Sequence, residues 1–354
     1  MKKIILTKKT KIYVMAPSNT FTGGPELLHQ VAFSLKKIFK IEVNMFYLPN
    51  LDRNFVHNNF KKYNLKHSKF VEDDPKNILI IPEYYLFLKY SLKYKKIKKV
   101  LWWLSIDNYF GYKFKYDFNK FVRSLIKIPF NIINLFNKIT NYYFGMIAYH
   151  DYLKIIYKCI NLNNQKELKQ IDFHLAQSIY AFNYLKKFFF NLRYLSDFQR
   201  SEILKNNKIN LKNKKNYICY SNKSNDFIKK IEKFTKVKMI KLSGFNNSQL
   251  INIYKKTKIY LDFGYHPGKD RMPREAAIFN NCIITNKRGS AKNKYDIPIN
   301  EKYKFEENYS SLSKIKTQIL KIFKDYKNEL KNFEPYKKKI INEKNSFIKD
   351  LKNI

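Results

Sequence analysis

The chain is poor in the residues that build disulfide-bonded or zinc-binding domains. Among its 354 residues are three cysteines, Cys159, Cys219 and Cys282, and their spacing fits neither a disulfide framework nor a zinc motif. It also lacks an apolar run of ~18 residues, so we expect no membrane-spanning helix. Lysines interrupt the apolar residues near the N-terminus, so we expect no signal peptide. Together these absences predict a cytoplasmic protein.

Acidic residues are scarce as well, with 28 Asp and Glu against 70 Lys and Arg, which gives a formal net charge of +42. Hydrophobic residues still make up 45% of the chain and aromatic residues 17%, which excludes a disordered protein. The basic charge has two interpretations: a solvated surface produced by an AT-rich genome, or attraction to an anionic membrane, a phosphate-bearing substrate or nucleic acid. Because the charge is spread over the whole chain without a compact basic motif, we expect no nucleic-acid partner.

Glycine and arginine are also scarce, and they gather in one region. Four of the eight glycines and three of the seven arginines fall between residues 244 and 289, namely Gly244, Gly264, Gly268, Gly289, Arg271, Arg274 and Arg288. Glycine permits close approach of the backbone to a ligand, and the planar guanidinium of arginine can bind phosphate through two hydrogen bonds. The region is therefore a candidate anion site, unless its glycines only end helices and turn loops.

Apolar segments of strand length alternate with segments of helical periodicity in two series. The first series predicts a helix at 26–39 and strands at 11–16, 42–48, 77–82, 99–106 and from 172 onward. The second series predicts helices at 225–234, 248–256 and 274–279 and strands at 216–220, 238–242, 259–263 and 282–285. Such alternation is typical of an α/β fold with parallel sheets.

The segment 111–165 differs from both series. Large apolar residues are mixed with lysine every few positions, which predicts long amphipathic helices. One interpretation is a structural insert that buries its aromatic face against the N-terminal domain. The other is an element lying in a membrane interface, with lysines near the headgroups and Phe, Ile and Leu among the acyl chains. In the second case the protein would be peripheral on the inner membrane.

One block of sequence, IYLDFGYHPGKDRMPREAAIFNNCIITNKRGSA at 259–291, resembles the nucleotide-sugar-binding block of a known family. This is the large retaining GT-B glycosyltransferase family that includes glycogen synthase and many bacterial polysaccharide glycosyltransferases. Pro273, Glu275 and the following alanines fall on the family pattern, in which a glutamate near a helix start binds the donor ribose. The family's other glutamate, eight residues earlier, is replaced here by Pro267.

Four other stretches carry the same resemblance: TGGPELLHQVAFSL at 22–35, YSNKSNDF at 220–227, LSGFNNSQLINIYKKTKIYLDF at 242–263 and, in part, VLWWLSIDNY at 100–109. In the last stretch Asp107 fits the family pattern, but Ile106 stands where a histidine is usual. The resemblance covers residues 220–300 well and 11–40 loosely.

The resemblance implies an α/β protein of the GT-B class, with two Rossmann-like domains facing a cleft, a helical insert and a C-terminal helical tail. We expect an N-terminal acceptor domain at 1–190, a polar linker at 191–214, a nucleotide-sugar-binding domain at 215–330 and a C-terminal helix at 331–354. The implied function is transfer of a sugar from a nucleotide-sugar donor to a cell-surface glycan or glycolipid acceptor, such as capsule or lipooligosaccharide. Two alternatives are a basic nucleic-acid-binding protein and a non-catalytic GT-B scaffold.

The resemblance also implies a set of substrate-binding residues: Gly23, Gly24, Lys223, Gly244, His266, Gly268, Lys269, Arg271, Glu275, Gly289 and Ser290. We expect three of these cations, Lys223, Lys269 and Arg271, to hold the donor diphosphate, assisted by backbone amides. No Asp-x-Asp motif follows a predicted strand, so we expect a metal-independent enzyme with no cofactor besides the nucleotide sugar. In an alternative interpretation Lys269 and Arg271 pair with Asp270 and Glu275 on the surface.

Three side chains are candidates for catalysis. An inverting transferase needs a base in the N-terminal domain to deprotonate the acceptor hydroxyl, and Asp107 is the first candidate and Glu83 the second. His266 lies between two glycines in the cation-rich loop and could donate to the sugar or the phosphate. A retaining enzyme would need neither carboxylate as a base, and the sequence leaves the stereochemistry open.

Overall fold

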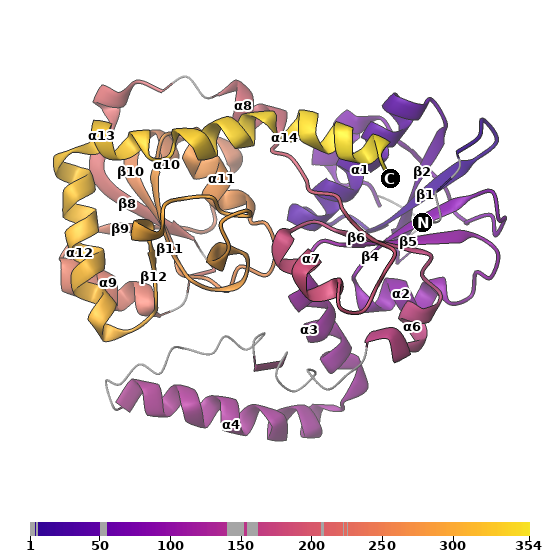
Figure 1. Cartoon of the computed structure of the whole chain (residues 1–354), viewed down its shortest axis with the longest axis horizontal. Helices are drawn as coiled ribbons and strands as arrows, with labels where there is room; N and C mark the ends of the chain where they lie inside the picture. Colours follow the sequence, from indigo (N-terminus) through magenta and orange to yellow (C-terminus); the bar gives the residue numbers. More distant parts are fainter. Residues whose placement is uncertain are drawn as a thin grey trace. The chain divides into compact units, whose positions relative to one another are not determined.

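A computed structural model of the chain describes residues 4, 6–49, 55–139, 152–153, 162–206, 209–221, 223–224 and 226–354. The chain divides into two compact units (Figure 1). Unit 1 comprises Met1–Asp117, Leu153–Asp197 and Ser346–Ile354, and unit 2 comprises Phe118–Tyr152 and Phe198–Asn345. Each unit contains one β-sheet, and the two are described separately below.

The sheet of unit 1 has seven strands in the order β3-β2-β1-β4-β5-β6-β7, and all its pairs are parallel. The strands are β1 (Lys11–Pro17), β2 (Glu42–Leu48), β3 (Lys66–His67), β4 (Ile78–Pro82), β5 (Lys98–Trp103), β6 (Phe173–Ala176) and β7 (Leu192–Tyr194). Every residue of β4 and the five central residues of β1 are buried, as expected for apolar strands covered on both faces. The sheet continues past residue 190, because β7 lies within the range expected to be a linker.

The described helices of unit 1 are α1 (Gly23–Phe39), α2 (Tyr85–Ser91), α3 (Ile106–Asp117), α6 (Lys166–Lys169) and α7 (Ile179–Leu185), with short 3₁₀ turns at Asn58–Tyr63 and Leu162–Asn164. In α1 the apolar residues of helical spacing, among them Leu28, Val31 and Leu35, are buried as the pattern predicted. The helix begins at Gly23 rather than at residue 26, so both glycines belong to its first turn.

The sheet of unit 2 has five strands, all paired in parallel, in the order β12-β11-β10-β8-β9. Its strands are β8 (Lys215–Ser221), β9 (Met239–Leu242), β10 (Thr257–Asp262), β11 (Cys282–Asn286) and β12 (Lys304–Phe305). The helices are α4 (Lys120–Ile139), α8 (Ser201–Lys205), α9 (Phe227–Thr235), α10 (Asn247–Lys256), α11 (Arg271–Ile278), α12 (Tyr309–Lys324), α13 (Tyr326–Lys331) and α14 (Glu334–Lys352), with 3₁₀ turns at Leu211–Asn213, Gly289–Lys292 and Glu301–Tyr303. These two parallel sheets confirm the predicted α/β class.

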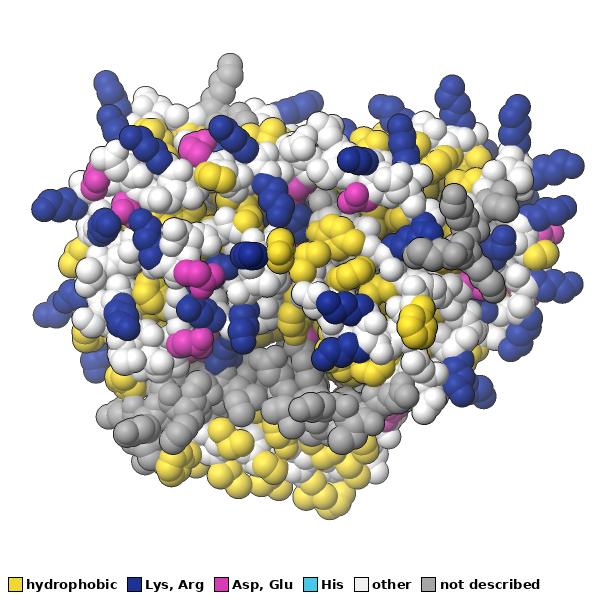
Figure 2. Space-filling view, viewed as in Figure 1, with side chains coloured by type: hydrophobic (Ala, Val, Ile, Leu, Met, Phe, Trp, Pro, Cys, Tyr) yellow, Lys and Arg dark blue, Asp and Glu magenta, His cyan; other side chains and the backbone are white. Residues whose placement is uncertain are grey.

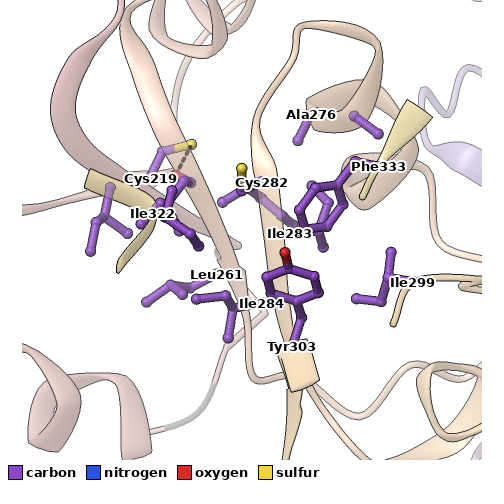
Figure 3. Close-up of a cluster of buried hydrophobic side chains, with 14 of the residues drawn as sticks. Cys219, Leu261, Ala276, Cys282, Ile283, Ile284, Ile299, Tyr303, Ile322 and Phe333 are labelled. Carbon is purple, nitrogen blue, oxygen red and sulfur yellow. Dashed lines mark hydrogen bonds between the residues drawn. The ribbon is translucent and has the colours of Figure 1, made fainter. Parts of the chain in front are cut away.

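The core of unit 2 forms where β10 and β11 meet the helices (Figure 3). Leu261 of β10 and Ile283 of β11 are fully buried, and Ile322 of α12 packs into the same cluster. Cys219 and Cys282 lie in this cluster as free thiols. The third cysteine, Cys159, lies outside the described residues.

Helix α4 lies in the segment 111–165 that was expected to be a helical insert. Although the sequence analysis placed this segment in the N-terminal domain, Phe118–Tyr152 groups with unit 2. Residues 140–151 and 154–161 of the insert lie outside the described residues.

Helix α14 is shared by the two units, because Ser346–Ile354 belongs to unit 1. In unit 2 the Glu343 carboxylate is buried between Nζ of Lys269, at 2.7 Å, and a guanidinium nitrogen of Arg274, at 2.8 Å. In unit 1 Arg193 donates a hydrogen bond to the backbone C=O of Asn353 at 2.9 Å. Polar contacts therefore hold Glu343 of the helix within unit 2 and Asn353, the residue after the helix, within unit 1.

Glu343→Ala should destabilise unit 2, because it leaves two buried cations without their shared carboxylate. Loss of one partner from a buried ion pair costs about 3–5 kcal/mol of unfolding free energy. Glu334→Ala, at an exposed position of the same helix, is the matched control and should change the free energy by less than ~0.5 kcal/mol. Urea unfolding of both variants measures the difference, and equal effects would contradict a stabilising role for the Glu343 contacts.

Candidate active site

In each sheet the strand order reverses at one point, so the loops that follow the two central strands run to opposite faces of the sheet; this is the switch point. In unit 1, β1 pairs with β2 on one side and β4 on the other, and in unit 2, β8 pairs with β9 and β10. In open parallel sheets, ligands bind beside the carboxyl ends of the strands at such switch points. The loops after β1 and β4, and those after β8 and β10, are therefore where a site is expected in each unit.

Unit 1 has a pocket of about 930 Å³ at its switch point. The walls come from the loop after β1, the first turns of α1, the residues after β4, and α2 and α3, and they include Gly24, Tyr84, Phe87 and Tyr112. The volume is that of a small-molecule site, and most of the lining side chains are apolar or aromatic. The structure thus places Gly24 at a pocket and Gly23 directly before it on the exposed start of α1, and a ligand contact of either glycine stays a prediction.

Glu83 follows β4 and is the one carboxylate among the described residues that line this pocket. It is buried, and one carboxylate oxygen accepts the backbone N–H of Leu104 at 2.9 Å. Burial raises the pKa of Glu83 to about 7, although N–H donors from Leu104 and Ser105 oppose the shift. At neutral pH this carboxylate can therefore accept a proton and release it again, as a general base requires.

Asp107, the first candidate for the base, has a different environment. It lies in the first turn of α3, is 1% exposed and accepts a hydrogen bond from the Tyr180 hydroxyl at 3.1 Å. It does not belong to the described lining of the pocket. The geometry therefore favours Glu83 over Asp107, although both assignments stay predictions.

In unit 2 the loops after β8 and β10 meet at the switch point. The Ser224 hydroxyl accepts the Phe263 N–H at 3.1 Å, and a Cβ on Gly264 would lie 3.3 Å from the Lys223 carbonyl oxygen. The side chain of Lys223 is 54% exposed, with its Nζ 3.9 Å from Asp270. Lys223 therefore carries a cation in solvent at the edge where a ligand is expected. Gly244, another predicted binding residue, lies two residues after β9 at the same edge.

His266 is buried within the loop after β10, where it contacts two carboxylates. Its Nδ1 lies 2.9 Å from Asp270, and its Nε2 lies 3.7 Å from Asp262. Burial alone would lower the pKa of His266, but the negative charges of Asp262 and Asp270 raise it to about 9. The ring is thus an imidazolium at neutral pH that holds its own loop together, and its contact with a substrate stays a prediction.

The turn after β11 is joined to this loop by close backbone contacts. Gly289 has φ of 48°, and a Cβ at this position would overlap the His266 carbonyl. The Ser290 N–H donates to the His266 carbonyl at 2.9 Å, and its hydroxyl donates to the Gly268 carbonyl at 2.5 Å. The Ser290 amide, predicted to face the diphosphate, is thus used within the protein.

The remaining predicted residues lie around the start of α11. Lys269 is buried rather than at the surface, and its Nζ lies 2.7 Å from the Glu343 carboxylate. Glu275 is buried, and its carboxylate lies 3.0 Å from the Arg200 guanidinium. Arg271 opens the helix, and its carbonyl accepts from the Gln199 side chain at 3.1 Å. Of the three expected diphosphate ligands, Lys223 is the most exposed.

Sequence reasoning missed Arg200 and Glu343. Arg200 lies in the stretch taken as a linker, yet it was one of seven arginines in a lysine-rich chain, and that scarcity was a usable signal. Glu343 lies in the basic C-terminal tail, where nothing in the local sequence indicates a buried partner. Across the described ranges, no three His, Cys, Asp or Glu side chains are grouped to hold a metal ion.

The chain is similar to known proteins in its structure but not detectably in its sequence. No protein-family model and no curated protein matches the sequence. The solved structure of HepE from Anabaena, in complex with UDP-glucose, matches with a TM-score of 0.55 and 9% identity over 97% of this chain and 100% of that one. Sucrose-phosphate synthase from Thermosynechococcus elongatus matches with a TM-score of 0.51 and 10% identity over 92% and 94% of the two chains.

The chain has a GT-B fold. At identities near 10% the similarity concerns the fold, and it extends over nearly the whole chain. It confirms the predicted fold class of two Rossmann-like sheets with a C-terminal helix.

Gly289→Ala should destabilise unit 2 more than Gly244→Ala. Both glycines have positive φ, 48° and 75°, but space is open around Gly244, whereas a methyl group on Gly289 meets the His266 carbonyl. We expect a cost of about 1 kcal/mol for Gly244→Ala from backbone strain and about 2–4 kcal/mol for Gly289→Ala from strain plus overlap. Urea unfolding measures both, and equal losses would show that the loop moves aside.

Proposed function

We propose that this protein is a glycosyltransferase that moves a sugar from a nucleotide-sugar donor to a hydroxyl of a glycan or glycolipid acceptor. The observation that carries the proposal is the pocket beside Glu83 at the switch point of unit 1, in a chain with a GT-B fold. HepE, a structural neighbour, was solved with UDP-glucose, which supports a nucleotide-sugar donor for this chain as well. We place the reaction in the cytoplasm and the product in a bacterial surface glycan such as capsule or lipooligosaccharide.

The pocket of unit 1 suits a sugar acceptor. Tyr84, Phe87 and Tyr112 offer flat apolar surfaces, and Glu83 is the single described carboxylate among them. We assign Glu83 as the base that takes the proton of the acceptor hydroxyl while its oxygen bonds to the anomeric carbon of the donor. The bond from that carbon to the diphosphate breaks at the same time, and the nucleoside diphosphate leaves with the bonding electrons. This displacement inverts the anomeric configuration, and in this respect the proposed reaction differs from that of the retaining family that the sequence resembles.

The loop cluster of unit 2 suits the donor. Lys223 carries an exposed cation at its switch point, and Arg271 begins α11. We assign these two to the diphosphate and Glu275 to the hydroxyls of the ribose, with Arg200 holding the Glu275 carboxylate in place. Lys269 positions the loop through Glu343 instead of binding the phosphate. In this proposal fixed protein cations balance the leaving charge, and no metal ion takes part.

Donor binding can be tested by thermal shift with UDP-, GDP- and dTDP-linked sugars, with a CMP-linked sugar, which has a single phosphate, as a comparison, since a ligand of the native state raises its unfolding temperature. We expect one of these nucleotides to stabilise the protein equally with and without EDTA. Glu275→Gln should weaken binding by about tenfold, because a charged acceptor becomes neutral. Glu301→Gln, at an exposed carboxylate of unit 2, is the control. Stabilisation that needs a divalent ion would overturn the metal-free donor site.

Glu83→Gln should lower kcat/KM for sugar transfer by about 10²–10⁴-fold. In the unchanged enzyme kcat/KM should rise as the pH increases through about 7, because a base acts only when deprotonated. The variant should lose this pH dependence, whereas Asp107→Asn should keep it. Loss of the pH dependence in Asp107→Asn instead, or a product with retained anomeric configuration, would contradict Glu83 as the base.

The free energy of unfolding of Glu83→Gln, measured as a function of pH, shows whether this variant folds. The pKa of Glu83 in the folded protein, about 7, lies above its ordinary value of 4.5, so ionisation of this buried group destabilises the fold as the pH rises. Above pH ~7 Glu83→Gln should therefore gain up to about 3 kcal/mol of unfolding free energy, and this gain should vanish below pH ~4.5.

A further inference from the structure

Helix α4 carries an apolar stripe that the described residues leave open to solvent. Five members are spaced alternately by four and three residues, Phe136 follows directly after the last of them, and all are strongly exposed: Phe121 71%, Leu125 48%, Ile128 48%, Ile132 59%, Leu135 56% and Phe136 54%. This spacing puts them on one side of a helix over a length of about 22 Å. Figure 2 shows hydrophobic side chains gathered along this helix at the lower edge of the view.

Another side of α4 contacts Tyr152. The Tyr152 hydroxyl donates to the Ile126 carbonyl at 2.7 Å, and the rings of Phe130 and Tyr152 lie 5.6 Å apart between centroids. Ile126 and Phe130 lie more than a quarter-turn from the centre of the exposed stripe. The stripe is thus the side of α4 turned away from these contacts.

The charges of α4 are all of one sign. The helix has Lys120, Arg123 and Lys127 along its described part, and its whole sequence contains no aspartate or glutamate. Lys120 and Lys127 directly precede Phe121 and Ile128, so the helical rotation places them about 100° from the stripe. A strip of cations therefore runs along one side of an exposed apolar surface, in a chain with a formal net charge of +42.

The cations beside the apolar stripe indicate which kind of partner covers it. A second copy of the chain would bring its own α4 cations against these cations, with no acidic residue on the helix to compensate. None of the helices in the described ranges has the length and apolarity needed to cross a membrane. A helix that lies flat in a bilayer interface combines these two features, with apolar side chains among the acyl chains and lysines at anionic headgroups.

We propose that the stripe of α4 docks on the surface of an anionic bilayer and holds the protein there. Phe121, Leu125, Ile128 and Ile132 enter the acyl boundary, while Lys120 and Lys127 contact lipid phosphates. This inference rests on the proposed function in one respect: the membrane would be the one that carries a glycolipid acceptor. The two can fail separately, since vesicle binding needs no donor or acceptor.

The test is co-sedimentation of the full-length chain with vesicles of phosphatidylcholine plus phosphatidylglycerol, and with vesicles of phosphatidylcholine alone. We expect binding to the anionic vesicles that weakens as salt is added. The pair Ile128→Asn and Ile132→Asn should weaken this binding by about tenfold or more, because two side chains no longer enter the acyl region. Asn131→Ser, also exposed on α4, is the matched control and should bind as the original chain does.

Two further measurements keep the result interpretable. The unfolding temperature and its shift by the donor nucleotide should be the same in the paired variant and the original, because the altered side chains are exposed. Unchanged vesicle binding by the paired variant would overturn the proposal. So would a concentration-dependent dimer, seen by sedimentation velocity without lipid and abolished by the same pair, since the stripe would then join two copies of the chain.

Discussion

Parallel strand pairing is the constraint from which the rest of this structure follows. Because every strand of each sheet runs in the same direction, the loops at the carboxyl ends collect at a single edge. In unit 1 this edge holds the pocket and Glu83, and in unit 2 it holds Lys223, His266 and the start of α11. Side chains distant in the sequence are thus gathered without any catalytic motif in the local sequence.

Three acidic residues of unit 2 are paired with cations in and around its site loops. Asp270 holds His266, Glu275 holds Arg200, and Glu343 lies between two cations. Each of these carboxylates is largely removed from water, so each needs the opposite charge beside it. Although the chain has a large excess of lysine, these cations in and around the site loops of unit 2 each have a carboxylate beside them. Lys223 differs from them because its side chain is exposed.

Much of the fold could be predicted from the sequence, and less of the site. Long apolar strands and the periodic face of α1 were predicted correctly because local pattern determines them. The short strands β3, β7 and β12 were missed, since two or three residues carry no periodicity. Lys269 was expected to hold the donor diphosphate, but it is buried against Glu343, and the sequence could not show this contact because Glu343 lies on a distant helix. Glu83 was ranked below Asp107 because sequence does not reveal which carboxylate opens into a cavity.

The overlap that a side chain at Gly289 would cause has a consequence for how such a sequence can change. Under the interpretation that an AT-rich genome shaped this composition, glycine is disfavoured throughout the chain, and eight glycines remain. A glycine that the backbone geometry requires resists replacement. In a chain of such biased composition, the few remaining glycines therefore indicate positions where the backbone allows no other residue.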